Sequence, residues 1–126
     1  MQLSGIFSGI TVIELASVLA GPAVGQFFAE LGATIIKIEN PHRGGDVTRS
    51  WKVKGETSGD ISSYFSSVNW GKKSVGIDLS DTDGRMLVYE LIRKSDFLIS
   101  SFKPGGAAKL GMDYEKVKEV NLSLIH

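Results

Sequence analysis

The apolar residues of this chain gather in short runs, and the first two runs flank a stretch with helical spacing. Residues 10–15 and 34–38 are each rich in β-branched side chains and short, as strands buried in a parallel sheet are. Between them, apolar residues recur at i, i+3, i+4 and i+7. These residues predict one buried stripe of a helix and are Val24, Phe27, Phe28 and Leu31.

Signals at both ends support this helix. Pro22 suits the first helical turn, where its missing N–H costs nothing, and Gly32 suits the C-terminal cap. The stretch 9–39 therefore predicts a β-strand, an α-helix and a second strand with a right-handed crossover.

The alternation continues toward the C-terminus. We expect a short helix within 61–68, a third strand at 73–79, a fourth at 97–100 and the start of a fifth at 122–126.

Two further helices are expected between and after these strands. The first begins with a capping box in which Ser80 is the N-cap and Asp83 the carboxylate three residues on. Its buried stripe is predicted to be Leu87, Val88, Leu91 and Ile92. The second helix carries Val117 and Val120 and has Asp113 as its N-cap.

Strands that alternate with helices are typical of an α/β fold, a Rossmann-like, doubly wound parallel sheet with helices on both faces. Ligands bind such sheets at the carboxyl ends of the strands. Here these ends open into four loops that carry much of the glycine and several basic residues. The first helix also presents its N-terminal N–H groups there, which favours an anionic ligand. The loops are residues 16–22, 40–59, 80–84 and 101–106.

Composition excludes several classes of function. The 126 residues include fourteen basic and fourteen acidic side chains, so net charge favours neither nucleic acid nor an anionic membrane surface. The absence of cysteine excludes disulfides, thiolate metal sites and a cysteine nucleophile within these residues, and two distant histidines make a zinc site improbable. No apolar run is long enough to span a bilayer, and no secretory signal is present. We therefore expect a soluble, cytoplasmic protein with no metal and no tightly bound cofactor.

Nucleotide motifs are incomplete. A dinucleotide site would need G-x-G-x-x-G after the first strand, yet the loop has the single glycine Gly21. Glu39 stands where the ribose-binding acid would lie, although a carboxylate at a strand end more often lies at the surface. No P-loop motif occurs, so nucleotide triphosphate hydrolysis is disfavoured.

Some charged side chains are expected to cap helices or lie in solvent, and others to contact a ligand. Asp78, Asp81 and Asp83 cluster near the third strand, but helix capping explains them better than a cation does. Lys72 and Lys73 should lie at the amino end of the sheet, in solvent. By contrast, Lys103 and Lys109 flank the fourth loop, where an ammonium group suits a phosphate. No catalytic residue can be assembled from spacing alone.

A series of ordered motifs resembles the N-terminal part of the family III CoA-transferases, which include formyl-CoA transferase, carnitine CoA-transferase and α-methylacyl-CoA racemase. The resemblance covers residues 9–126. The matching segments are Gly9-Ile10-x-Val12-x-Glu14-Leu15, Ala20-Gly21-Pro22, Leu31-Gly32-Ala33, Ile36-Lys37-Ile38-Glu39, Gly45-Asp46-x-x-Arg49, Tyr64-Phe65-x-x-x-Asn69, Lys72-Lys73-Ser74-Val75-x-Ile77-Asp78-Leu79, Gly84-Arg85, Ser95-Asp96, Phe102-x-Pro104-Gly105 and Leu110-Gly111.

The resemblance implies a Rossmann-like large domain that binds coenzyme A, of which residues 1–126 are the incomplete N-terminal part. It also implies an interlocked homodimer that transfers coenzyme A between an acyl-CoA and a free carboxylic acid through an aspartyl intermediate. The nucleophilic aspartate would lie beyond His126. We therefore expect coenzyme A or acyl-CoA as substrate and no turnover by this chain alone.

The resemblance also implies coenzyme-binding positions. Asn40 stands where an arginine often packs on the adenine, and Lys109 replaces an arginine that contacts a phosphate; the lysine keeps the charge without the bidentate fork. Glutamine precedes Ala20 in the formyl-CoA transferases, so Leu19 argues against formyl or oxalyl specificity. The complete predicted set is Leu19, Ala20, Asn40, Ile77, Asp78, Leu79, Ser80, Ser101, Phe102, Lys103 and Lys109.

Two alternatives remain open on the sequence. A racemase of the same fold would use acid–base residues beyond His126 to exchange a proton next to the thioester. A non-catalytic coenzyme A-binding protein would retain the loops without the chemistry. Sequence following residue 126 would separate them.

Overall fold

The protein, described by a computed structural model over residues 5–126, is built on one sheet of four parallel strands in the order β3-β2-β1-β4. The strands are β1 (Thr11–Leu15), β2 (Thr34–Glu39), β3 (Lys73–Gly76) and β4 (Phe97–Ser100). The order changes direction beside β1, the first strand, so the loops that follow β1 and β4 leave the same sheet edge next to each other.

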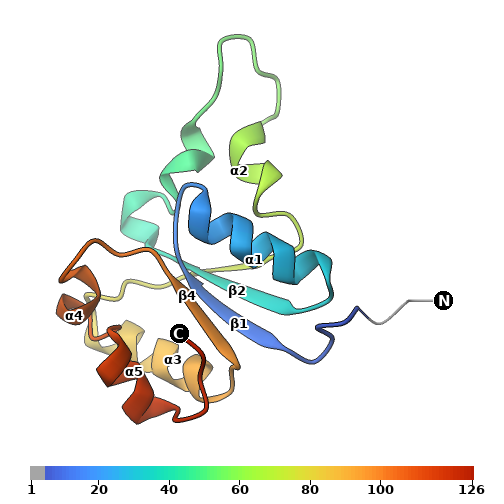
Figure 1. Cartoon of the computed structure of the whole chain (residues 1–126). Coiled ribbons are helices and arrows are strands. Elements are labelled where there is room, and N and C mark those ends of the chain that lie inside the picture. Colours follow the sequence, from blue (N-terminus) through green and yellow to red (C-terminus); the bar gives the residue numbers. More distant parts are fainter. Residues whose placement is uncertain (1–4) are drawn as a thin grey trace.

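Helices cover both faces of this sheet (Figure 1). Helix α1 (Ala20–Glu30) lies on one face, and α3 (Thr82–Arg93) and α5 (Tyr114–Val120) lie on the other. The remaining helical turns are η1 (Pro41–Arg43), η2 (Val47–Ser50), α2 (Ser63–Ser67) and α4 (Gly106–Lys109). The predicted doubly wound α/β architecture is confirmed.

Alternate residues of the strands pack into two separate hydrophobic cores, one on each face of the sheet. Ile13 and Leu98 point toward α3 and α5, where they pack with Val88, Ile92 and Val117, all buried. The residues that face α1 form a smaller core of Val12, Ala33 and Ile35, with partly buried Phe7, Phe28, Phe97 and Ile99 around it. Strands β1 and β2 are therefore largely buried on both faces, as the runs of apolar residues predict, whereas the edge strand β3 is exposed along its length.

The predicted stripe of α1 is only partly correct. Val24 is 46% exposed and Phe27 55% exposed, whereas the helix buries Pro22, Gly25 and Gln26. The reason is the charged residue beneath the helix. A Cβ at Gly25 would fall well inside van der Waals contact of Glu14 Oε2, so this side of α1 needs a residue without a side chain to approach β1.

Other local predictions shift by a few residues. Asp81, and not Ser80, is the N-cap of α3, because its carboxylate accepts a hydrogen bond from Gly84 N at 3.0 Å. Leu87 of the predicted α3 stripe is 59% exposed, while Val88 and Ile92 are fully buried. This leaves α3 with a narrower buried face than its four apolar residues suggest.

The ends of three elements also differ from expectation. Strand β3 ends at Gly76 instead of residue 79, and the expected fifth strand is reduced to a single bridge between Phe97 and Ile125. Asp113 is the N-cap of α5 by position, but its side chain makes no capping hydrogen bond. The short helix within 61–68 and the strand at 97–100 are confirmed.

We predict that Gly25→Ala destabilises the fold by about 1–3 kcal/mol, because the new methyl group must displace the buried Glu14 carboxylate. Alanine is otherwise the better helix former. Thermal unfolding followed by circular dichroism measures the change. Gly106→Ala is the matched control, since its Cβ would lie 3.6 Å from Phe102 Cβ in ordinary contact. A Gly25→Ala variant as stable as the Gly106→Ala variant would contradict this packing.

Candidate ligand site

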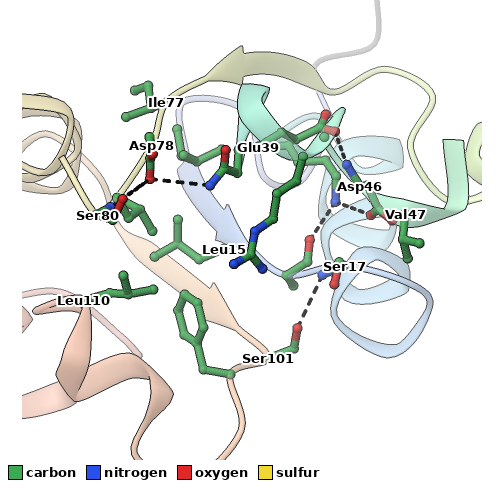
Figure 2. A pocket seen from close by; sticks show the side chains of 18 residues that line it. Leu15, Ser17, Glu39, Asp46, Val47, Ile77, Asp78, Ser80, Ser101 and Leu110 are labelled. Atoms are coloured by element: carbon green, nitrogen blue, oxygen red, sulfur yellow. Dashed lines mark hydrogen bonds and ion pairs between the residues drawn. The ribbon is translucent and has the colours of Figure 1, made fainter.

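A cavity opens at the carboxyl ends of the strands, where a doubly wound sheet binds its ligand. Its volume is about 530 Å³, within the usual range for small-molecule sites. Figure 2 shows Asp78 and Ser80 on one side of the cavity and Ser17 and Ser101 on another. The full lining is Leu15, Ala16, Ser17, Lys37, Ile38, Glu39, Asn40, Arg43, Gly45, Asp46, Val47, Ile77, Asp78, Leu79, Ser80, Ser101, Phe102 and Leu110.

The structure brings most of the predicted coenzyme positions together. Segments that are 20 or more residues apart in sequence converge on the cavity and supply seven of the eleven: Asn40, Ile77, Asp78, Leu79, Ser80, Ser101 and Phe102. The other four are exposed and do not line the cavity: Leu19, Ala20, Lys103 and Lys109. Their assignment to a ligand stays a prediction.

A hydrogen-bonded turn fixes the side of the cavity formed by residues 77–80. Asp78 Oδ1 accepts hydrogen bonds from Ser80 N at 2.9 Å and Ser80 Oγ at 2.7 Å, and from Asn40 Nδ2 at 3.4 Å. The bonds from Ser80 lower the pKa of Asp78, with a smaller contribution from the nearby charges of His42 and Arg43. A charged carboxylate at this wall favours ligand groups that donate hydrogen bonds.

Arg43 is the cationic side chain that sequence reasoning overlooked at this site. It is exposed, it lines the cavity three residues after Asn40, and it makes no salt bridge to any described residue. Its position in a loop after a predicted strand was the only signal in the sequence. A guanidinium group here suits a phosphate or an aromatic base.

Four buried charges lie together next to the cavity, and two of them, Lys37 and Asp46, line it. We call Glu14, Lys37, Asp46 and Lys72 the charge network. Lys37 Nζ lies 2.9 Å from Glu14 Oε1, its partner in the β1–β2 register, and Lys72 Nζ lies 2.8 Å from Glu14 Oε2. All four side chains are at most 2% exposed. Asp46 Oδ2 lies 3.0 Å from Lys37 Nζ but accepts no hydrogen bond, so that contact is an ion pair only.

The network corrects the expectation that Lys72 lies in solvent. Its ammonium group also donates to Pro22 O at 2.7 Å and to Asn69 Oδ1 at 3.0 Å. Burial lowers the pKa of Lys72, and the contacts with Glu14 oppose that shift. A charged residue inside a strand buried on both faces, as Glu14 and Lys37 are, is the signal that could have indicated the network.

Glu39 is likewise not the surface carboxylate that its strand-end position favoured, because the residue is 7% exposed. Arg49 donates to both carboxylate oxygens, at 2.8 and 2.7 Å, and Ser74 Oγ donates at 2.6 Å. Burial alone would raise the pKa of Glu39, but the hydrogen bonds outweigh it and hold the pKa at about 2. The pair joins β2 to the loop that carries Arg43 and Asp46.

Within residues 5–126, no group of three or more His, Asp or Glu side chains is arranged to hold a metal ion. None of the described helices combines the length and apolar character required to cross a membrane.

Comparison with known proteins gives this geometry a context. A sequence model of CoA-transferase family III matches residues 7–126. The chain belongs to CoA-transferase family III. The resemblance seen in the motifs is thereby confirmed.

Two CoA-transferases and one solved structure are similar to this chain. It is 46% identical over 123 residues to the succinate–glutarate CoA-transferase of Agrobacterium fabrum, covering 94% of this chain and 30% of that protein. It is 43% identical over 122 residues to the acetyl-CoA:oxalate CoA-transferase of Acetobacter aceti, covering 97% and 30%. A crystal structure of a CaiB/BaiF family protein from Brucella suis matches with a TM-score of 0.83 and 42% identity, over 94% of this chain and 32% of that one.

These relatives are much longer than the sequence in hand. The chain spans about 30% of the length of the two CoA-transferases and about a third of the crystallised one. Most of each relative therefore has no counterpart in the described residues.

The Glu39–Arg49 pair predicts an acid-dependent loss of stability. The pKa of Glu39 is about 2 in the folded protein against an ordinary value of 4.5, so the folded state binds fewer protons within that window. The free energy of unfolding should fall as the pH drops through it, by roughly 3 kcal/mol in total at about 1.36 kcal/mol per pH unit.

Urea unfolding from pH 6 to pH 3 measures this dependence. Glu39→Gln should be less stable at pH 6 and should show a shallower decline with acid. Glu90→Gln is the matched control, because Glu90 is 58% exposed on α3 and pairs only with Arg93 of the same helix. Parallel pH profiles for wild type and Glu39→Gln would contradict the assigned pKa.

Proposed function

We propose that the cavity at the strand ends binds coenzyme A, and that the whole protein transfers coenzyme A between an acyl-CoA and a free carboxylic acid. The observation that carries this proposal is the family match over residues 7–126, which includes every segment that lines the cavity. The relatives from Agrobacterium fabrum and Acetobacter aceti are named as CoA-transferases, which favours transfer over the racemase alternative.

The cavity offers complementary groups for the adenosine end of the coenzyme. Ile77 and Leu79 supply apolar contact, and the charged Asp78 can accept hydrogen bonds from an amino or hydroxyl group. Arg43 supplies the guanidinium that Asn40 lacks, either stacked on the adenine or paired with a phosphate. Ser101 would act with the outlying Lys103 and Lys109 toward the phosphates.

The chemistry would come from an aspartate outside the described residues. Its carboxylate attacks the thioester carbonyl of the acyl-CoA, the C–S bond breaks, and the coenzyme A thiolate leaves as an anhydride forms. The thiolate then attacks the aspartyl carbonyl of the anhydride, which releases the acid and leaves an aspartyl thioester. The acceptor carboxylate repeats these steps in reverse and leaves as the new thioester.

Residues 1–126 are, in this proposal, the coenzyme-binding N-terminal part of a larger Rossmann-like domain. The full protein would act as an interlocked homodimer in the cytoplasm, with the second chain completing the active site. The exposed apolar side of α1, which carries Val24 and Phe27, fits a surface that other protein segments cover.

We predict that the purified, folded chain binds coenzyme A weakly and shows no transferase turnover, because these residues form the cavity while the proposed nucleophile lies beyond residue 126. Isothermal titration calorimetry measures binding, with NAD as the comparison ligand. Binding of NAD in place of coenzyme A would overturn the proposal. Rapid exchange of coenzyme A between an acyl-CoA and a free acid would refute the inactivity.

Arg43→Gln should weaken coenzyme A binding about fivefold, the equivalent of roughly 1 kcal/mol for an exposed charged contact. The melting temperature should not change, because Arg43 pairs with no described carboxylate. Arg93→Gln is the matched control, since Arg93 lies on α3 outside the cavity and pairs with Glu90. Equal affinities for the two variants would remove Arg43 from the site.

A further inference from the structure

The loop between β1 and α1 contains the single non-glycine residue of the described chain that has a positive φ angle. Val18 has φ of 71°, in the left-handed region, and its side chain is β-branched. Such a residue is a true outlier there, because Cβ crowds the backbone. A conformation of this kind persists only where the surrounding structure imposes it.

Contacts on both sides of Val18 impose it. Asp46 Oδ1 accepts a hydrogen bond from Val18 N at 3.4 Å, and Ser101 Oγ accepts one from Ser17 N at 3.3 Å. Lys37 Nζ donates to Ala16 O at 2.7 Å, before the strained residue. Asp46, Ser101 and Lys37, which make these contacts, also line the cavity next to this loop.

The far end of the loop is held by the other lysine. Lys72 Nζ donates to Pro22 O at 2.7 Å, in the first turn of α1. Glu14 joins the two restraints, because its two carboxylate oxygens bind Lys37 and Lys72 separately. The charge network therefore makes hydrogen bonds to the loop backbone at residues 16, 18 and 22.

Stability is a weak reason for such a network. Taking four charges out of water is costly, and apolar residues of similar size often serve as well or better in a buried position. What an apolar set would lack is directional contact with the loop backbone. We therefore interpret the charge network as a set of contacts that fixes loop 16–22, and not mainly as a source of folding stability.

Loop 16–22 and the start of α1 present backbone N–H groups that have no hydrogen-bond acceptor within the described residues. Within residues 5–126, the N–H groups of Leu19, Ala20 and Gly21 donate no hydrogen bond. The first turn of α1 has neither an acidic residue nor a side-chain cap to occupy them. Water or a ligand must satisfy these donors.

We propose that the charge network is a positioning device that holds Val18 in its left-handed conformation and so presents the loop 16–22 to the coenzyme. This inference rests on the proposed function. Asp46, Lys37 and Lys72 act here as positioning residues, since they hold the backbone of a loop whose residues Ala16 and Ser17 line the cavity.

A double-mutant cycle tests the proposal. Asp46→Asn keeps an oxygen acceptor but removes the charge that attracts Lys37. Val18→Gly removes the strain, because glycine adopts this φ freely. Asp46→Asn should weaken coenzyme A binding at least about fivefold in the Val18 background, and by a clearly smaller factor in the Val18→Gly background. Asp83→Asn, an exposed carboxylate on α3, is the matched control.

Amide hydrogen exchange without ligand provides a second, independent readout. Segment 16–22 should exchange faster in Asp46→Asn than in wild type, with the increase confined to that segment. Equal losses of affinity in both backgrounds, or unchanged exchange and affinity in Asp46→Asn, would overturn the positioning role. A wild-type chain that binds no coenzyme A would refute the proposed function, while the exchange data would still decide whether the network restrains the loop.

Discussion

The pairing of Glu14 with Lys37 inside the sheet is the constraint on which most of this structure depends. The two residues are direct neighbours across β1 and β2, and both are fully enclosed. Leaving either charge alone in the interior would cost several kcal/mol, by the general scale of buried ions. The pair is completed by Lys72, the residue before β3, and by Asp46, from the loop after β2. It also explains why α1 approaches β1 through Gly25, while Phe27 of the same helix stays exposed.

The alternation of strands and helices could be predicted from the sequence because it depends on local patterns. β-branched runs mark strands buried on both faces, and Pro22 and Gly32 mark the ends of α1. The buried face of α1 could not be predicted in the same way. Apolar periodicity assigned Phe27 to the core, but the face is chosen by a carboxylate 13 residues earlier in the chain. The choice of the buried face of α1 is made only when β1 and β2 have paired and Glu14 is enclosed beneath the helix.

Some parts of the candidate site could likewise be predicted from the sequence, and others could not. Segments 77–80 and 101–102 could be placed at the cavity because the carboxyl ends of parallel strands share one edge. The contribution of Arg43 and the part that Asp46 and Lys72 take in the charge network could not, because each depends on how the 33-residue segment between β2 and β3 returns to the sheet. The strain at Val18 is likewise invisible in sequence, since valine gives no signal for a left-handed backbone.

The account as a whole requires that coenzyme A occupy the cavity at the strand ends. The most direct test is a titration of the ¹⁵N-labelled chain with coenzyme A, followed through backbone amide chemical shifts. The account predicts the largest changes at residues 16–22, 40–46, 77–80 and 101–103, the segments that contain the lining residues of the cavity or adjoin them. Shifts concentrated instead in the apolar groove between β3 and α3, around Val75 and Leu87, would contradict it.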